Sequence, residues 1–227
     1  MAGQMGEDKT AKRIVLHGHK PSPGNSPRED TEPDGRYIYL LSPADSAGRR
    51  AKMLFNPQSK SVLSERLRTT GIPLGEAFSF MSSLYFRGKL AYATTFAKPT
   101  PGMPTTLVIT PSRGLLRPET IVKFEDLTAI SAERIQAHNP KYRDPLERDL
   151  RLLSEAIGQR FHVVFLGSVA TRKYVPLLLE VLGERVLVPR AFIGLGNMSR
   201  GALLLRCTRE KRELEYISIA EALSKMA

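Results

Sequence analysis

The segment Phe161-His-Val-Val-Phe-Leu166 carries the clearest strand pattern in the sequence, because β-branched and aromatic residues dominate it. A short apolar run of this kind is typical of a strand that is covered on both faces of a sheet. Tyr37-Ile-Tyr-Leu-Leu41 and Leu107-Val-Ile-Thr110 share the pattern. Residues 185–188 and 214–217 are expected to add a short strand and an edge strand.

Segments with helical features alternate with these strands. Residues 144–157 are amphipathic, contain a proline near their start and are followed by Gly158, as helices often are. Helices are also predicted for residues 59–68, 84–96, 173–182 and 198–207. The alternation predicts an α/β fold, a three-layer α/β/α sandwich with a mostly parallel central sheet.

The chain is expected to hold one folded domain behind a disordered leader. Residues 1–35 are rich in proline, glycine and charged side chains and offer almost nothing to bury, so disorder is expected there. Residues 36–227 contain no internal repeat and no second linker, so a single α/β domain is expected for them.

Several classes of protein are excluded by what the sequence lacks. No stretch reaches the roughly 18 consecutive apolar residues of a membrane-spanning helix. The N-terminus has no apolar segment typical of a secretory signal. Cys207 is the single cysteine, which excludes an internal disulfide framework and favours a cytoplasmic location. His138 and His162 have no partner at ligand spacing, so no metal site is predicted.

Charge is the most informative part of the composition. The whole chain has a formal net charge of +11. Residues 1–35 carry five basic and six acidic side chains, so the remaining residues carry a net charge of +12. Arginine dominates this excess, and its planar guanidinium suits phosphate. Because a basic, arginine-rich fold attracts polyanions, nucleic acid or a phosphorylated ligand is the expected partner.

Four loops after predicted strands combine small residues with arginine or lysine, namely residues 42–50, 110–114, 167–173 and 194–201. Ligands of open α/β sheets bind at the carboxyl ends of strands, where backbone N–H groups can approach an anion. None of the loops has the GxxxxGK[ST] or GxGxxG pattern, so no nucleotide cofactor is predicted. The residues expected to bind phosphate or DNA are Arg49, Arg50, Arg87, Lys173 and Arg200.

The segment Ser82-Ser-Leu-Tyr-Phe-Arg-Gly-Lys89 gathers hydroxyl, aromatic and basic side chains at the start of a predicted helix. Aromatic rings can stack on a base while neighbouring cations hold its phosphate. The alternative is that Tyr85 and Phe86 are core aromatics, with Arg87 and Lys89 solvated. The residues expected to bind a base are Ser42, Ser83, Tyr85, Phe86, Ser112, Arg113, Gly167 and Ser168.

Two residues are candidates for catalysis. Asp45 directly follows the first strand and is the carboxylate best placed to activate a water molecule. Lys89 is a candidate nucleophile if burial lowers the pKa of its amine. An ordinary surface ion pair is the alternative for each. Cys207 lies in an apolar helix and is expected to be a small buried hydrophobe.

Three segments resemble, in the same order, the motifs of the YaaA peroxide-stress family: Leu41-Ser-Pro-Ala-Asp45, Ser83-Leu-Tyr-Phe-Arg-Gly-Lys-Leu-Ala-Tyr-Ala93 and Ile109-Thr-Pro-Ser-Arg-Gly-Leu-Leu-Arg-Pro118. That family has an ISPAK-like first strand, a helix entered through a vYxGLxA-like turn, and an LSGxYGxLRPxDxIxPY segment. Here Thr-Pro-Ser-Arg stands where the family has Ser-Gly-x-Tyr, and Phe124-Glu125 replaces Pro-Tyr.

The last third of the chain resembles uncharacterised bacterial relatives of that family. Relatives of this type also resemble DpdC of the 7-deazaguanine DNA modification system, which is thought to convert a nitrile-bearing deazaguanine in DNA to its amide. The resemblance therefore implies a DNA-linked role, a pocket for a purine-like base and partner proteins from such a system. One hypothesis is an enzyme that hydrates the nitrile of the base. Asp45 would activate water, or Lys89 would add to the nitrile carbon.

Two other functions stay open at this point. A non-catalytic DNA-binding stress-response protein would explain the basic charge equally well and would need no catalytic residue. A protein that binds a small phosphorylated metabolite would have a pocket but little salt-dependent affinity for DNA.

Overall fold

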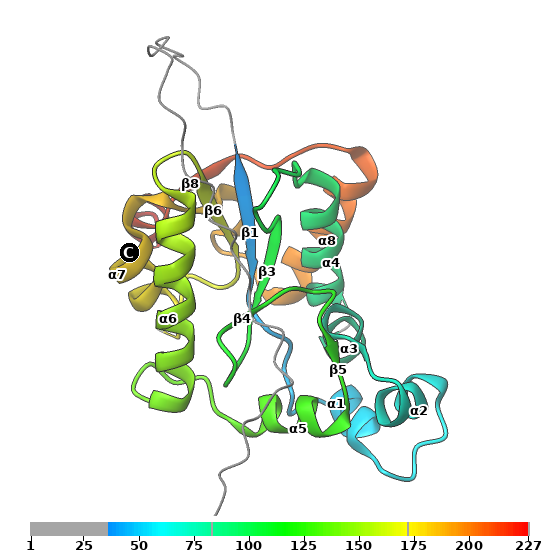
Figure 1. Cartoon of the computed structure of the whole chain (residues 1–227). Coiled ribbons are helices and arrows are strands. Elements are labelled where there is room, and N and C mark those ends of the chain that lie inside the picture. Colours follow the sequence, from blue (N-terminus) through cyan, green and yellow to red (C-terminus); the bar gives the residue numbers. More distant parts are fainter. Residues whose placement is uncertain (1–35, 83, 172, 227) are drawn as a thin grey trace, which may run out of the picture.

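The chain, as a computed structural model, is described at residues 36–82, 84–171 and 173–226, so the expected leader lies outside the described residues. A six-stranded sheet in the order β4-β3-β1-β6-β7-β8 forms its centre (Figure 1). The strands are β1 (Tyr37–Leu41), β3 (Thr106–Ile109), β4 (Leu115–Leu116), β6 (His162–Leu166), β7 (Val186–Pro189) and β8 (Tyr216–Ser218). The four inner strands are parallel, and β4 and β8 pair antiparallel at the two edges. The predicted mostly parallel sheet is confirmed.

Helices cover both faces of the sheet, which confirms the three-layer prediction (Figure 1). One face packs against α6 (Pro140–Ile157), α7 (Val175–Leu182) and α9 (Ile219–Ser224). The other face packs against α1 (Arg49–Phe55), α2 (Val62–Thr69), α3 (Leu74–Ser82), α4 (Leu84–Phe96), α5 (Phe124–Ala132) and α8 (Asn197–Glu210). A small separate ladder joins β2 (Ile72–Pro73) to β5 (Ile121–Val122).

The position of β1 inside the sheet explains why its sequence is apolar throughout. The strand pairs with β3 on one side and with β6 on the other, so it lies inside the sheet, and helices cover both of its faces. Ile38 and Leu40 join the core beneath α6 and α7, whereas Tyr39 and Leu41 join the core beneath α4 and α8. None of these side chains is more than 1% exposed.

Helices α2, α6, α7 and α8 have boundaries one to four residues from the predicted ones, and the two largest shifts of a helix start are those of α6 and α2. The helix expected from residue 144 begins at Pro140, because Asn139 is its N-cap and the Asn139 side chain accepts a hydrogen bond from the Lys141 amide. Pro140 is thus the first-turn proline, and Pro145 lies inside the helix. The helix expected from residue 59 begins at Val62, after the capping side chain of Ser61.

Helices α1, α3 and α5 were not predicted. The residues directly before them are Gly48, Pro73 and Lys123, so none begins after the serine, threonine, aspartate or asparagine that usually marks a helix start. Each has only seven to nine residues, which leaves little room for an apolar period to repeat. Helices α1 and α3 lie between β1 and β3 along the chain, whereas α5 follows β5 and precedes α6.

The chain reverses its direction of travel across the sheet between β1 and β6. The segment after β1 leads to β3 on one side, through helices of one layer. The segment after β6 leads to β7 on the other side, through α7 in the opposite layer. The gap between the carboxyl ends of such a strand pair is where ligands of doubly wound sheets bind.

Candidate functional site

A hydroxyl and an amine meet at this switch point. Ser42 directly follows β1, and its hydroxyl donates a hydrogen bond of 3.4 Å to the Leu166 carbonyl at the end of β6. The Lys89 amine, carried by α4, donates to the Ser42 carbonyl and, at 2.8 Å, to the Ser42 hydroxyl. Both side chains are buried: Lys89 is 1% exposed and Ser42 6%.

Lys89 has no acidic partner among the described residues. Its amine instead lies 4.5 Å from the centroid of the Tyr85 ring and 4.9 Å from that of Phe86. Burial lowers the pKa of Lys89 well below its ordinary value, because water is removed from the ammonium ion. A neutral lysine amine is a base and a nucleophile, which a solvated ammonium is not.

A close crossing of α4 and α8 holds Lys89 in place. A Cβ atom built on Gly88 would lie 2.7 Å from the Gly201 carbonyl oxygen, and one built on Gly201 would lie 2.8 Å from the Tyr85 Cα. Only glycine allows the two backbones to approach so closely. The crossing places Lys89 of α4 and Arg200 of α8 in the same part of the core.

Arg200 and Tyr85 complete the buried polar group beside Lys89. Arg200 is 4% exposed, and its guanidinium donates to the Phe192 carbonyl at 3.0 and 3.2 Å. Burial raises the pKa of Tyr85, and nearby Arg200 opposes this rise. The Tyr85 hydroxyl nevertheless has no hydrogen-bond partner of good geometry among the described residues. An unsatisfied buried hydroxyl favours a site that a water molecule or a ligand atom completes.

Some predicted site residues lie elsewhere than expected. The expectation that Phe86 stacks on a base does not fit its complete burial, since it packs in the core against Phe78 at a centroid distance of 5.3 Å. Tyr85 is 8% exposed, too little for an open stacking platform. The alternative of core aromatics fits both rings, but a solvated Lys89 does not fit its burial. Arg200 is 4% exposed and donates to a backbone carbonyl in the interior, so it does not lie on the surface where a DNA phosphate was expected to bind.

The other residues expected to bind a base do not form one group. Arg113 forms a 2.8 Å ion pair with Asp126, and the Ser112 hydroxyl donates weakly to the Ala129 carbonyl. Gly167 is buried under the Phe165 ring, and Ser168 beside it is half-buried. Ser83 lies outside the described residues.

Asp45 remains on the surface. One of its carboxylate oxygens accepts a 2.9 Å hydrogen bond from the Ala47 amide, which is the local bond of an Asx turn. The side chain is exposed, in the loop between β1 and α1, and makes no ion pair with a described residue. This contact gives Asp45 a role in shaping the loop.

Four cations surround the carboxyl end of the sheet on the outside. Arg49 and Arg50 begin α1, Arg87 lies in the first turn of α4, and Lys173 precedes α7. All four are exposed, and none forms an ion pair with a described residue. Arg50 lies over the Phe80 ring at 5.8 Å from its centroid. We call Arg49, Arg50, Arg87 and Lys173 the cationic rim.

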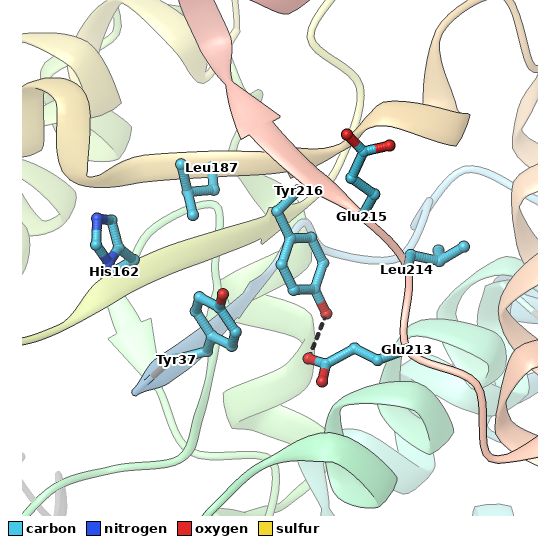
Figure 2. Close-up of a pocket in the computed structure, with 7 residues that line it drawn as sticks. All are labelled: Tyr37, His162, Leu187, Glu213, Leu214, Glu215 and Tyr216. Carbon is cyan, nitrogen blue, oxygen red and sulfur yellow. Dashed lines mark hydrogen bonds between the residues drawn. The ribbon is translucent and has the colours of Figure 1, made fainter. Parts of the chain in front are cut away.

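A pocket of about 400 Å³ opens at the opposite, amino-terminal end of β1 (Figure 2). Sequence reasoning missed it. It is lined by Tyr37, His162, Leu187, Glu213, Leu214, Glu215 and Tyr216. The segment Glu213-Leu-Glu-Tyr216 carries a usable signal, since it sets two carboxylates and an aromatic ring beside a predicted edge strand.

A hydroxyl network supports one wall of this pocket. The Glu213 carboxylate accepts a hydrogen bond from Tyr216 at 2.9 Å (Figure 2). It accepts another from Tyr39 at 2.8 Å. The Tyr216 hydroxyl also lies 2.8 Å from that of Tyr92, which accepts from the Leu214 amide. Burial raises the pKa of Tyr92 to about 12 and those of Tyr39 and Tyr216 further, so all three hydroxyls stay protonated near neutral pH.

No family model, curated protein or solved structure matches this chain. In the described part of the chain, no helix combines the length and the apolar composition of a membrane span. The same part contains no group of three histidine, cysteine, aspartate or glutamate side chains that could hold a metal ion.

Proposed function

We propose that this chain is an enzyme acting on a modified base in DNA, with Lys89 as the reactive amine. The observation that carries the proposal is a buried lysine at the switch point of a doubly wound sheet, whose amine bonds to Ser42 and pairs with no acidic side chain among the described residues. Perturbed titratable groups at ligand-binding positions are candidates for catalysis. A lysine with a purely structural role would normally have a carboxylate partner or reach solvent.

The resemblance to the YaaA family suggests the substrate, a nitrile-bearing 7-deazaguanine. The Lys89 nitrogen would form a bond to the nitrile carbon, and the proton that it loses would pass to the nitrile nitrogen, which gives an amidine. A water molecule would then add to the amidine carbon, and cleavage of the carbon–lysine bond would release the amide and restore the amine. The net change is the addition of one water molecule to the nitrile.

Ser42 and the cationic rim have supporting roles in this proposal. The Ser42 hydroxyl, 2.8 Å from the amine, would hold it in place and relay its proton. The rim residues would bind phosphates on either side of the base, which must leave the duplex stack to reach the site. Because Lys89 is 1% exposed, the loop after Ser42 would have to move before a base could reach the amine.

The test uses a DNA duplex that carries the nitrile base, followed by mass spectrometry of the digested nucleosides. We expect the wild-type chain to add the mass of one water molecule to the base. Lys89→Met and Lys89→Arg should abolish this conversion while duplex binding is retained, and Asp45→Asn is the control that should keep it. Conversion at the wild-type rate by Lys89→Met would exclude Lys89 as the reactive group.

A second function, DNA binding without catalysis, is favoured by one specific observation. The rim cations are exposed and free of ion pairs with described residues, whereas the amine is sealed beneath Ser42. A protein that only binds DNA needs exposed, unpaired cations but does not need a buried amine. Binding of unmodified duplex with a steep salt dependence, with no change in any nucleoside, would support this function instead.

A further inference from the structure

A carboxylate without a cation stands out on a chain whose formal net charge is +11. Glu213 forms no ion pair with any lysine or arginine in residues 36–82, 84–171 or 173–226. Its partners are the two tyrosine hydroxyls, which donate hydrogen bonds and leave its negative charge in place. Glu215, two residues further on, differs because Arg190 pairs with it at 2.9 Å.

Aromatic rings stand beside this carboxylate. Tyr37 and Tyr216 meet edge to face, with centroids 5.0 Å apart, and His162 lies 6.5 Å from Tyr37 (Figure 2). In Figure 2 the Glu213 carboxylate lies near both tyrosine rings, whereas Glu215 points away from Tyr37. The pocket volume of about 400 Å³ lies within the range of small-molecule sites.

We propose that this pocket binds a small organic cation, through an ammonium or guanidinium group held between Glu213 and the rings of Tyr37 and Tyr216. Faces of aromatic rings attract such cations, and an adjacent carboxylate adds direct charge attraction. The Tyr39 and Tyr216 hydroxyls fix the carboxylate in place, so little side-chain order has to be created on binding. The inference is independent of the proposed function, because Tyr37 and Lys89 serve opposite ends of β1.

This pocket should reject the phosphate groups that the cationic rim is proposed to bind. A phosphate would meet the Glu213 carboxylate directly, and like charges in contact are unfavourable. Neutral ligands would gain the ring contacts alone. A cation gains both, so the positive charge of the ligand is the property to test.

The experiment titrates choline into the full-length chain and compares it with 3,3-dimethylbutan-1-ol, a neutral analogue of the same shape. Calorimetry gives the affinity, and tyrosine fluorescence gives a second signal, because the chain has no tryptophan and two of its seven tyrosines line the pocket. We expect saturable choline binding and at least about tenfold weaker binding of the neutral alcohol, which is the equivalent of about 1.4 kcal/mol. Binding of the neutral alcohol as tightly as choline would overturn the proposal.

Matched glutamate variants locate the site. Glu213→Gln should weaken choline binding about tenfold, whereas Glu215→Gln, which removes an already paired carboxylate, should change it less than about threefold. Tyr37→Leu provides a second route, because Tyr37 lies outside the hydroxyl network and its loss should weaken binding without disturbing Glu213. Wild-type affinity in both Glu213→Gln and Tyr37→Leu would exclude this pocket.

Two further probes distinguish the possible sources of the cation. Agmatine represents a free metabolite, and N-acetyl-lysine methylamide represents a side chain on another protein. Agmatine binding alone indicates a small-molecule site, and binding of the blocked lysine indicates a docking site for a basic peptide. Both results support a cation site, whereas failure of choline and of both of these probes would contradict it.

Discussion

The two ends of β1 hold charged groups in opposite situations. At the carboxyl end, Lys89 is buried in the core, and its polar contacts among the described residues are a hydroxyl and a carbonyl. At the amino end, Glu213 is exposed and accepts hydrogen bonds from tyrosine hydroxyls. The strand between them spans five residues, about 17 Å. Neither group forms an ion pair with a described residue, and burial lowers the pKa of Lys89 well below its ordinary value.

This difference separates two kinds of chemistry. Burial lowers the pKa of Lys89, which favours the neutral, nucleophilic form of the amine, and it also shields the amine from solvent. Glu213 is exposed and lines the pocket, which suits reversible binding. Substitutions at each end of β1 test this contrast, and they follow from the largest expected effect to the smallest.

Gly201→Val should have the largest effect, because it disrupts the close crossing of α4 and α8 that holds Lys89 in place. The new side chain would meet backbone atoms of Leu84 and Tyr85, which cannot rotate away. Overpacking of this kind costs about 3 kcal/mol of unfolding free energy, or more where backbone has to move. Urea denaturation measures the loss.

Gly196→Ser is the matched control for that variant, at the N-cap of the same helix. Its φ of −77° suits any residue, and its Cβ would have no atom within 4 Å. A serine there can cap the helix, so stability should stay within about 1 kcal/mol of wild type. If Gly201→Val also stayed within that range, the close crossing would not be needed to hold Lys89.

Lys89→Met should raise stability while it removes the proposed activity. Burying an amine without a charge partner costs about 1–3 kcal/mol, and an apolar chain of similar length avoids this cost. Because the native pKa of Lys89 is lowered, the unfolded chain binds more protons between that value and the ordinary pKa of about 10.4. Wild-type stability therefore contains a contribution that rises with pH across this window, and Lys89→Met should lack it.

Urea denaturation at several pH values between 7 and 10 checks this prediction. Lys52→Met, which changes an exposed lysine on α1, is the control and should leave both the stability and its pH slope nearly unchanged. A loss of stability in Lys89→Met would mean that the contacts with Ser42 outweigh the desolvation of the amine.

Tyr216→Phe tests the amino end of β1 by removing one hydroxyl from the tyrosine network. The lost hydroxyl serves Tyr39, Tyr92 and Glu213, so its removal should cost about 1–2 kcal/mol of unfolding free energy. Tyr37→Phe is the control, because the Tyr37 hydroxyl has no hydrogen bond to a described residue; it should change stability by less than about 0.5 kcal/mol. Equal effects of the two variants would show that the network does not stabilise this end.

The sheet and the candidate lysine could be predicted from the sequence for a physical reason. Strands covered on both faces must be continuously apolar, so β1, β3 and β6 stand out as runs, and their order along the chain indicates the α/β class. Lys89 could be singled out because it sits in an aromatic segment after the first strand. Its burial could not, because that depends on contacts between α4, α8 and β1.

The pocket shows where sequence reasoning ends. Its walls come from β1, β6, β7 and the segment before β8, which are up to 179 positions apart between Tyr37 and Tyr216. Glu213 and Glu215 look alike in the sequence, and only the fold pairs Glu215 with Arg190. Helices α1, α3 and α5 were missed for a simpler reason, the lack of a start signal.

The smallest effects are expected at single rim residues, tested as Arg49→Gln, Arg87→Gln and Lys173→Gln. If each contacts one phosphate, each variant should lower affinity for duplex DNA less than about tenfold and reduce the slope of log affinity against log salt by about 0.9. Arg151→Gln is the control, because Arg151 already pairs with Glu147 at 2.7 Å on α6. Fluorescence anisotropy across a salt series measures both quantities. If Arg151→Gln lowered the slope of log affinity against log salt as much as Arg87→Gln does, DNA affinity would depend on the total charge of the chain. The cationic rim would then be no more important for DNA binding than the rest of the surface.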